Sequence, residues 1–552
     1  MRTWISSAAI VAIAFSLLGS AAGLAPSAVE GQKFYKDDPI WQDPETQDAS
    51  SVKRVRSSQW FDFAENTFTD AGDQSTIRAV NVNTVDEVPD SSWFENRIGR
   101  ESWTAERVAQ GADTGSGPAP GTWTVIEAKS EGITPGLTIK DSRGDTYFVK
   151  FDPPWNPEMA TGAEVICTKF FYAFGYHTPQ NYLATLEPAN ITIASGTVIT
   201  DVDNRERPMK LRDIHEVLEK TAKNADGTYR VVASFAIPGT PIGKFKYHGT
   251  RPDDPNDIHP HEHRRELRGM LPIAAWLNHD DSRSINTHDV LLKEGGRALV
   301  KHYLLDFGST LGSGSTHAQT ARASHEYIWE ARPTFLTLAT MGLYIRPWLR
   351  AKYPDLPSVG RYESDFFTPE NWKPEYPNPA FRNARPDDTF WAARIVSRMS
   401  DDAIRAVVAT AKYSNPEATK YMTDTLIARK RKVVEHWLNA TNPVVNPSLS
   451  ASGALTFENA AVEAGVAKPA ERYTLVWSRL DNATGTHTFV GGEQTVTTTA
   501  GQAPPELLRG GDYISVTIRG YQADRAGWRQ PVFVYFRRAA DGWSLVGLER
   551  DR

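Results

Sequence analysis

Three short stretches between residues 279 and 308 carry side chains that can exchange a proton with a hydroxyl group and hold a divalent cation. They are His279-Asp280-Asp281, Asn286, and Asp306-Phe307-Gly308. A carboxylate can accept the proton of an attacking hydroxyl, and carboxylate and amide oxygens suit Mg²⁺ as ligands. The spacing therefore predicts a proton acceptor near a cation site.

The sequence between Asn286 and Asp306 predicts a β-hairpin. Residues 290–292 and 299–305 are mostly apolar, and Gly295 and Gly296 lie between them. Two glycines between apolar runs are typical of a tight hairpin turn. Such a hairpin would bring Asn286 and Asp306 back to one place.

This combination resembles the catalytic loop and Asp-Phe-Gly turn of the protein-kinase-like superfamily. The resemblance is closer to its atypical branches: HipA-type toxin kinases, phosphoinositide kinases and secreted kinases. It implies ATP as phosphoryl donor, Asn286 and Asp306 as ligands of Mg²⁺ or Mn²⁺, and Asp281 as the proton acceptor. Asp281 is preferred to Asp280 because only Asp281 has His279 two residues before it and Asn286 five residues after it.

The preceding segment has the pattern of a kinase N-lobe. Strands are expected over residues 122–128, 137–141 and 146–151, and the apolar spacing of residues 158–174 predicts a helix. The resemblance places Lys150 where a lysine pairs with nucleotide phosphates. It also makes Glu164 the carboxylate that orients this lysine, with Glu158 as second choice.

The turn containing Gly132 and Gly136 lies where a phosphate-covering loop is expected. It lacks the Gly-x-Gly-x-x-Gly pattern, and Pro135 removes one backbone donor. A plain hairpin turn is the alternative interpretation.

Residues 262–277 predict a helix, kinked at Pro272, that leads into the catalytic loop. The sequence His259-Pro-His261-Glu-His263 could bind a metal, but polar residues at a helix start explain it better. Helical patterns from 331 to 438 indicate a helical C-lobe. No Ala-Pro-Glu follows the Asp-Phe-Gly turn, so the chain gives no sign of a standard peptide-docking groove.

The N-terminus predicts export. An apolar run at residues 4–18, followed by small residues, is typical of a secretory signal peptide cleaved near Ala22, with an uncleaved anchor as the alternative. Cys167 is the single cysteine, which fits a bacterial periplasm or cell exterior better than a eukaryotic secretory pathway, and it is expected to be buried. The net charge of −6 gives no sign of nucleic acid or an anionic membrane as a partner, and no stable membrane span is expected after signal cleavage.

The predicted fold class is α+β: a bilobal protein-kinase-like fold with an N-terminal extension and a C-terminal antiparallel β domain resembling a sandwich. The extension is expected to pack through Trp41, Trp60, Phe61, Trp93 and Phe94. The predicted parts are a signal peptide (1–22), the irregular extension (23–120), the N-lobe (121–250), the C-lobe (251–442) and the β domain (443–552).

Three functions are compatible with these residues. The first is an exported atypical kinase acting on an unidentified protein or small-molecule acceptor. The second is a pseudokinase or nucleotide-binding scaffold of the cell envelope, which the scarcity of nucleotide outside the cytoplasm favours. The third keeps an enzyme but replaces phosphoryl transfer with nucleotidyl transfer.

Overall fold

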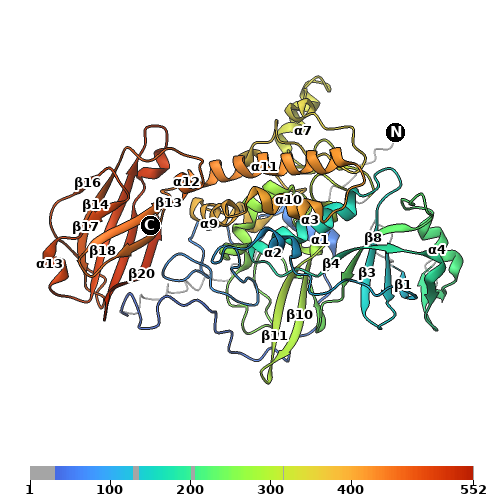
Figure 1. The fold of residues 1–552 in the computed structure, drawn as a ribbon, viewed down its shortest axis with the longest axis horizontal. Helices are drawn as coiled ribbons and strands as arrows, with labels where there is room; N and C mark the ends of the chain where they lie inside the picture. The colour runs from blue at the N-terminus through green and yellow to red at the C-terminus, as the bar shows by residue number, and fades with distance from the viewer. Residues whose placement is uncertain (1–30, 129–135, 201–205, 315, 551–552) are drawn as a thin grey trace, which may run out of the picture.

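The computed structural model describes residues 31–128, 136–200, 206–314 and 316–550. The predicted signal peptide lies outside these residues. The fold is mixed α+β, as predicted, with a β domain at one end, helices in the middle and a twisted sheet at the other end (Figure 1). Among the described residues, none of the helices has the length and apolar character that crossing a bilayer requires.

The sheet at the N-lobe end contains the three predicted strands. Its order is β4-β8-β3-β2-β1-β5. Tyr147, Val149 and Phe151 of β3 are buried in the small apolar core of this lobe, so alternation along the strand turns Lys150 to the opposite face. The strands are β1 (Trp123–Ala128), β2 (Gly136–Lys140), β3 (Thr146–Phe151), β4 (Asn181–Leu186), β5 (Ile191–Ile193) and β8 (Tyr229–Phe235).

Helix α3 (Met159–Phe174) links this sheet to the C-lobe, and almost all of its residues are buried. Asp152 stabilises its first turn by accepting hydrogen bonds from the backbone nitrogen and the hydroxyl of Thr161, at 2.8 and 2.6 Å. Cys167 lies within the helix with no exposed surface, as predicted.

The predicted helix over residues 262–277 is divided. It consists of a 3₁₀ turn, η2 (His261–His263), and two helices, α5 (Arg265–Arg268) and α6 (Met270–Leu277). The interruption is at Gly269, where an added Cβ would lie 2.9 Å from both the Arg265 carbonyl oxygen and the Trp391 ring. The break therefore falls at Gly269, where the chain packs closely against Trp391, and Pro272 lies in the first turn of α6, where proline is tolerated.

The predicted hairpin is confirmed. Strands β10 (Thr287–Glu294) and β11 (Arg297–Leu304) pair throughout, and β9 (Thr240–Gly243) extends the sheet. Gly295 and Gly296 have φ angles of 58° and 85°, a conformation that glycine adopts without strain.

The rest of the C-lobe is helical and shares one apolar core with the β domain. Trp276 of α6 is fully buried and donates from its indole nitrogen to the Leu426 carbonyl at 2.8 Å. The helices are α8 (Pro379–Arg382), α9 (Pro386–Ser397), α10 (Asp401–Ala409) and α11 (Pro416–Leu438), and α7 (Ala331–Ala339) projects away from them.

The β domain contains two antiparallel sheets, as its alternation predicts. Their strands contribute Leu455, Leu475 and Val516 to the core shared with the helices. One sheet has the order β12 (Val444–Leu449), β13 (Ala454–Asn459), β17 (Ala500–Gln502). The other contains β15 (His487–Phe489), β14 (Arg472–Leu480), β16 (Gln494–Val496), β18 (Tyr513–Tyr521), β19 (Val532–Ala539) and β20 (Gly542–Arg550).

Short elements complete the chain. They are α1 (Gln59–Phe68), α2 (Ala105–Gln110), η1 (Pro188–Asn190), β6 (Val198–Thr200), β7 (Glu206–Pro208), α4 (Leu211–Leu218), η3 (Ser284–Asn286), η4 (Phe307–Ser309), η5 (Pro347–Arg350), η6 (Pro369–Asn371), α12 (Ala460–Glu463), α13 (Pro505–Leu508) and η7 (Ala526–Arg529).

The extension packs through only some of the predicted aromatic residues. Trp93 and Phe94 are buried, but Trp41, Trp60 and Phe61 are exposed, which corrects the expectation for those three. Polar contacts hold much of the remaining extension. The number of aromatic residues in the sequence is therefore larger than the number of rings that pack into the core.

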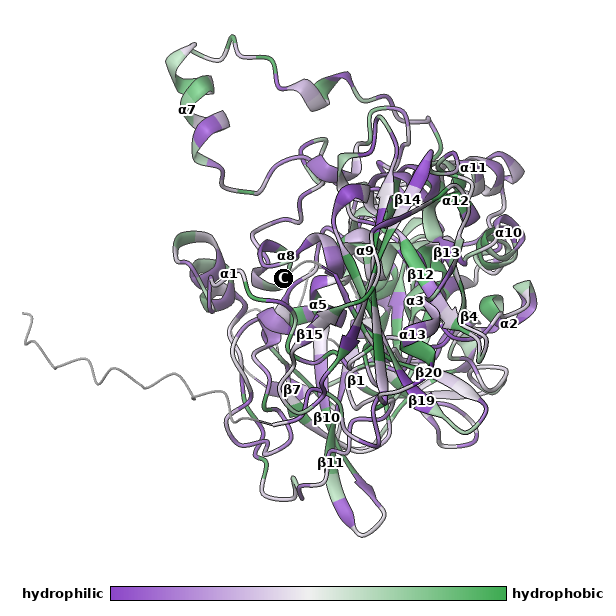
Figure 2. Cartoon of the chain, turned by 90° about the vertical axis from the view of Figure 1, so that its left-hand side faces the viewer, coloured by the Kyte–Doolittle hydropathy of each residue, from purple (hydrophilic) through white to green (hydrophobic). Residues whose placement is uncertain are grey.

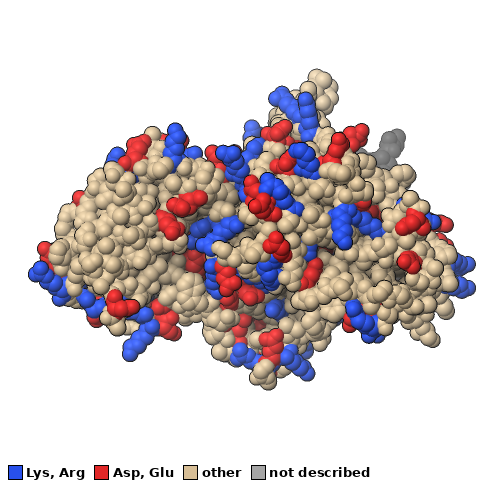
Figure 3. Space-filling model, viewed as in Figure 1, with Lys and Arg blue, Asp and Glu red and all other residues tan. Residues whose placement is uncertain are grey.

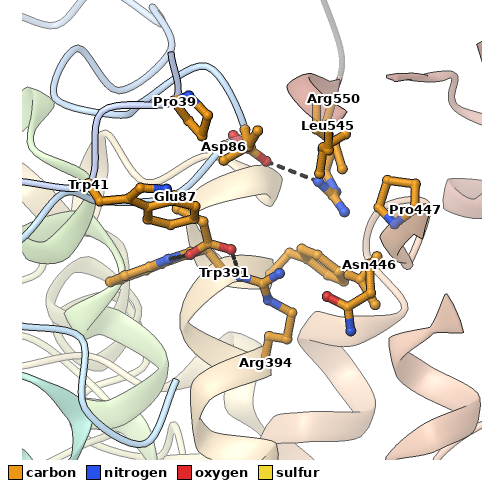
Figure 4. Close-up of a pocket in the computed structure, with 14 residues that line it drawn as sticks. Pro39, Trp41, Asp86, Glu87, Trp391, Arg394, Asn446, Pro447, Leu545 and Arg550 are labelled. Atoms are coloured by element: carbon orange, nitrogen blue, oxygen red, sulfur yellow. Dashed lines mark hydrogen bonds and ion pairs between the residues drawn. The ribbon is translucent and has the colours of Figure 1, made fainter. Parts of the chain in front are cut away.

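Extension, C-lobe and β domain meet around a cavity of about 330 Å³ (Figure 4). Glu87 contacts Arg394 of α9 and accepts a hydrogen bond from the Trp391 indole at 3.0 Å. Asp86 accepts from Arg550 of β20 at 3.0 Å. These contacts connect three segments that lie far apart in the sequence.

Asp86 also belongs to a buried charge network. Its carboxylate contacts Arg78 and Arg265, both at 2.5 Å, and Arg265 in turn binds Asp387 and Asp388 of α9 at 2.7 and 3.0 Å. Burial alone would raise the pKa of Asp86, but the charges of Arg265, Arg550 and Arg78 outweigh it and hold the pKa well below its usual range.

Candidate active site

Lys150 is the centre of the site. Its Nζ lies 3.0 Å from Glu164 Oε2 on α3 and 2.9 Å from Asp306 Oδ1, next to η4. Burial alone would lower the Lys150 pKa, but the charges of Asp306 and Glu164 outweigh it and raise the pKa above its ordinary value. The amine is therefore a fixed positive charge where the sheet, α3 and the Asp-Phe-Gly turn meet.

Glu164 is positioned by a residue that the sequence analysis did not identify. Asn181, the first residue of β4, donates from Nδ2 to Glu164 Oε1 at 3.0 Å and to Thr168 Oγ1 at 2.8 Å. Both Asn181 and Glu164 are buried. One Glu164 oxygen thus faces Asn181 while the other faces Lys150, which fixes the plane of the carboxylate. Glu158, the second choice, instead accepts from the Ser414 backbone nitrogen at 2.9 Å.

The Asp-Phe-Gly turn is held by packing. Phe307 is fully buried and lies 4.9 Å from the Phe171 ring of α3 and 5.8 Å from the His279 ring, measured between centroids. Asp306 has a φ of 58°, in the left-handed region. Phe307 therefore points into the core while the Asp306 carboxylate faces Lys150.

The loop of residues 279–286 meets the same turn through the backbone. The backbone nitrogen of Leu305, the residue before Asp306, donates to the Asn286 carbonyl at 2.8 Å. Asn286 is buried, and its Nδ2 donates to the Asp281 carbonyl at 2.9 Å. This hydrogen bond leaves the Asn286 amide oxygen as the atom that could bind a cation.

Asp281 is partly exposed and forms an ion pair with Arg283. Arg283 also reaches Glu375 Oε2 at 2.7 Å. The sequence analysis did not identify Arg283, although its position two residues after Asp281 is a local signal for this ion pair.

Asp280 and His279 have different surroundings from Asp281. Burial, and then the charge of Glu375, raises the pKa of Asp280 to about 7, although the Ser324 backbone nitrogen donates to it at 3.3 Å. Burial lowers the pKa of His279 to about 4. His279 is therefore neutral at pH 7, and its ring serves to pack against Phe171 and Phe307.

The predicted phosphate-covering loop is described only at its end. Gly132 lies outside the described residues, whereas Gly136 begins β2 directly opposite Lys150 in the β2–β3 pairing. The loop thus enters the sheet beside the lysine.

Two of the three histidines near residue 260 have acidic partners. His261 Nε2 lies 2.7 Å from Asp257 Oδ2, and His263 Nε2 lies 2.9 Å from Asp73 Oδ2. In the part of the chain that the structure describes, no group of three or more His, Cys, Asp or Glu residues is arranged to hold a metal.

A divalent cation at Asp306 and Asn286 would thus rely on one carboxylate and one amide oxygen. Mg²⁺ is commonly held by one or two protein carboxylates together with waters and substrate phosphates. The chemistry of this donor set fits Mg²⁺ or Mn²⁺ bound together with a nucleotide.

No known protein-family model matches the sequence, and no curated protein matches it. Two solved structures are similar in fold. One is the proinflammatory kinase CtkA of Helicobacter pylori, at 13% identity and a TM-score of 0.31, covering 58% of this chain and 97% of that one. The other is hydra Fam20 with sugar, at 10% identity and a TM-score of 0.28, covering 57% and 84%. The TM-scores are low, so the geometry of the site carries the proposals below.

Proposed function

We propose that this protein is an atypical kinase that transfers the γ-phosphoryl group of ATP to an acceptor hydroxyl. The observation that carries the proposal is the contact of one lysine amine with both Glu164 and Asp306, at 3.0 and 2.9 Å. The three residues come from three separate elements. A structural ion pair would need only one carboxylate, whereas phosphoryl transfer needs a fixed cation beside a metal-binding carboxylate.

Each residue has a role in this reaction. Lys150 binds the nucleotide phosphates, and Glu164, fixed by Asn181, orients it. Asn286 and Asp306 hold Mg²⁺ or Mn²⁺, which neutralises phosphate charge when bound. Asp281 aligns the acceptor hydroxyl and accepts its proton.

In the transfer step, the acceptor oxygen forms a bond to the γ-phosphorus while the bond between that phosphorus and its bridging oxygen breaks. ADP leaves with the electron pair of the broken bond, and the acceptor proton moves to the Asp281 carboxylate. Arg283, once it turns from its ion pair with Asp281, adds positive charge near the transferred group. Catalysis in this scheme comes from positioning and charge neutralisation.

One observation favours the second candidate, a nucleotide-binding scaffold without transfer activity. Asp281 is paired with Arg283, which Glu375 also binds. A carboxylate held in this way accepts a proton less readily, because the cation stabilises its charged form. Activity requires Arg283 to turn from Asp281 toward phosphate.

We further propose that the protein works after export, in the bacterial periplasm or outside the cell, on a protein or small-molecule acceptor. The apolar run at residues 4–18 supports this proposal.

The deciding experiment is a transfer assay with ATP labelled at the γ-phosphate, using purified protein in millimolar Mg²⁺. Autophosphorylation and ATP hydrolysis are the readouts, since no acceptor is identified. Asp306→Asn should remove nearly all label transfer, and Asp512→Asn, at an exposed position in the β domain, should leave it unchanged. Nucleotide binding without release or transfer of label would establish the scaffold instead, and transfer of label only from α-labelled ATP would indicate nucleotidyl transfer.

A further inference from the structure

Residues 328–352 form an arm that projects from the C-lobe between the Asp-Phe-Gly turn and α8. It contains α7 and η5. In Figures 1 and 2 the arm extends beyond the rest of the molecule, with α7 near its far end.

The arm exposes large apolar side chains. Six of them are Phe335, Leu338, Met341, Leu343, Ile345 and Leu349. Exposure peaks at Met341, with 94% of its surface accessible, and is lower at Phe335 (68%) and Leu349 (57%) on the two sides. Met341 and Gly342 both have positive φ, 50° and 87°, and form the turn at the tip. Single exposed apolar residues are ordinary, but a contiguous group indicates a surface that contacts something apolar.

The arm's exposed charges are all basic. Arg332 precedes the apolar residues, and Arg350 and Lys352 follow them. The single acidic residue of the arm, Glu330, is partly buried and pairs with Lys373 at 2.6 Å. This local positive charge contrasts with the net charge of −6 of the whole chain. In Figure 3 the projecting tip is uncharged and blue side chains lie below it.

Helix α1 projects on the same side of the molecule as α7 (Figure 2). It exposes Trp60, Phe61 and Phe68, and the exposed basic residues Arg54 and Arg56 precede it. Two separate elements on this side of the molecule thus have exposed apolar side chains close in sequence to exposed basic ones, although exposed Asp70 follows α1.

We propose that the arm docks the protein onto the surface of an anionic phospholipid bilayer. The apolar tip enters the boundary between headgroups and acyl chains, while Arg332, Arg350 and Lys352 stay at the level of the lipid phosphates. Apolar insertion combined with basic residues is how segments that lie on a membrane without crossing it are held there. This proposal does not rest on the proposed kinase activity.

The shape of the arm disfavours two other occupants. A helix that docks in a protein groove presents one stripe of anchors along its length, whereas here the apolar residues continue past the end of α7 and around the tip. A second copy of this chain would bring the same basic residues close together, and like charges repel. A bilayer accepts both the wedge shape and the positive charge.

The test is co-flotation of the full chain with vesicles of phosphatidylcholine alone or of equal parts phosphatidylcholine and phosphatidylglycerol. The protein should bind the anionic vesicles and lose binding at high salt. Met341→Asp combined with Leu343→Asp should weaken binding at least tenfold, and Arg350→Glu combined with Lys352→Glu should do the same. Residues 4–18 are common to all variants, so any binding that they cause would be unaffected.

The matched control is Phe489→Asp, because Phe489 is 69% exposed but lies in the β domain. It should float like the parent, and all variants should unfold at the parent's temperature. The proposal would be overturned if the parent does not float with anionic vesicles. It would also be overturned if the tip variant, Met341→Asp with Leu343→Asp, binds as the parent does, or if Phe489→Asp loses as much binding as the tip variant. If the parent does not bind vesicles but self-associates in light scattering, and the tip variant does not self-associate, the arm binds a second copy instead.

Discussion

The contacts of Lys150 determine how a nucleotide could enter the site. Its amine is shared between Glu164 and Asp306, at 3.0 and 2.9 Å, and a nucleotide triphosphate would bring several negative charges to the same place. One lysine offsets only part of this charge, so Asp306 would repel the phosphates unless a divalent cation lies between them.

Nucleotide binding should therefore depend on metal. We expect ATP affinity in EDTA to be at least tenfold weaker than in millimolar Mg²⁺, a difference of about 1.4 kcal/mol or more. Titration calorimetry in the two buffers measures it. Equal affinities in the two buffers would indicate that the Asp-Phe-Gly turn has only a structural role. The nucleotide-binding scaffold would then be the better-supported function.

Asp280 and Asp281 should differ in their effect on transfer. Asp281→Asn removes the proposed proton acceptor and should lower the transfer rate by about 10²-fold or more. Asp280→Asn should retain transfer, because Asp280 faces the Ser324 backbone nitrogen. Initial rates of label transfer at saturating ATP distinguish them, and the reverse pattern would make Asp280 the base.

Asp280 should also make stability depend on pH. Its pKa is raised from about 3.8 to about 7, so between these values the folded state binds more protons than the unfolded state, and the contribution to stability falls as pH rises. Asp280→Asn removes this penalty. The variant should gain stability over the parent at pH 8 but not at pH 4, by on the order of 1 kcal/mol, because the side chain keeps some exposure to solvent. Denaturant unfolding at both pH values is the measurement, and a gain independent of pH would contradict it.

At the scale of elements, α3 and η4 form one unit. Glu164 and Phe171 of α3 face Lys150 and Phe307 respectively. Gly308 lies against the same helix, and a Cβ added there would be 3.2 Å from Glu164 Oε2. A larger residue at this position would crowd the Glu164 carboxylate, whereas the backbone conformation would not exclude it.

Gly308→Ala should therefore displace Glu164 by a few tenths of an ångström and loosen Lys150. We expect about tenfold slower transfer with little change in unfolding temperature. Gly492→Ala is the control, because an added Cβ there meets nothing within 4 Å. Wild-type transfer rates in Gly308→Ala would indicate that Glu164 does not need its present position.

Local patterns predicted the elements of the site but not every contact between them. Alternation in residues 146–151 and the paired glycines at 295 and 296 are local signals, and β3 and the hairpin follow them. The role of Asn181 depends on a contact 17 residues distant, for which no local pattern exists. An arginine is expected on the surface, yet Arg265 is fully buried. Its charge is paired there with Asp86 and Asp387, which come from distant segments of the chain. The reverse error occurred at Trp60 and Phe61, which are exposed despite their apolar rings.

At the scale of the whole molecule, Asp86 joins the extension to the C-lobe and the β domain. It contacts Arg265 at 2.5 Å and Arg550 at 3.0 Å. Burial lowers the pKa of Arg550 to about 10 even with Asp86 beside it, so Arg550 remains charged at neutral pH. Removing the carboxylate would leave buried cations without their anion.

Asp86→Ala should lower the free energy of unfolding by about 3–5 kcal/mol. Because the pKa of Asp86 is depressed in the folded state, its contribution is fully present above pH 4 and is lost as pH falls below it. The parent and variant curves should therefore begin to converge below pH 4 and approach each other further at lower pH, as measured by urea unfolding from pH 7 to pH 2. Asp37→Ala, at an exposed position in the same extension, should cost little, and an equal cost for both variants would show that the network does not contribute.

The Asp86–Arg550 pair also sets an order for the folding of the chain during synthesis. The two residues are 464 positions apart, and Leu548 of β20 donates its backbone hydrogen bond to Thr84 of the extension at 2.8 Å. At about 5–20 residues per second, ribosomes complete β20 roughly 25–90 seconds after Asp86. During that interval Asp86 can meet Arg78 and Arg265 but not Arg550, so only the contacts between the extension and β20 form after synthesis is complete.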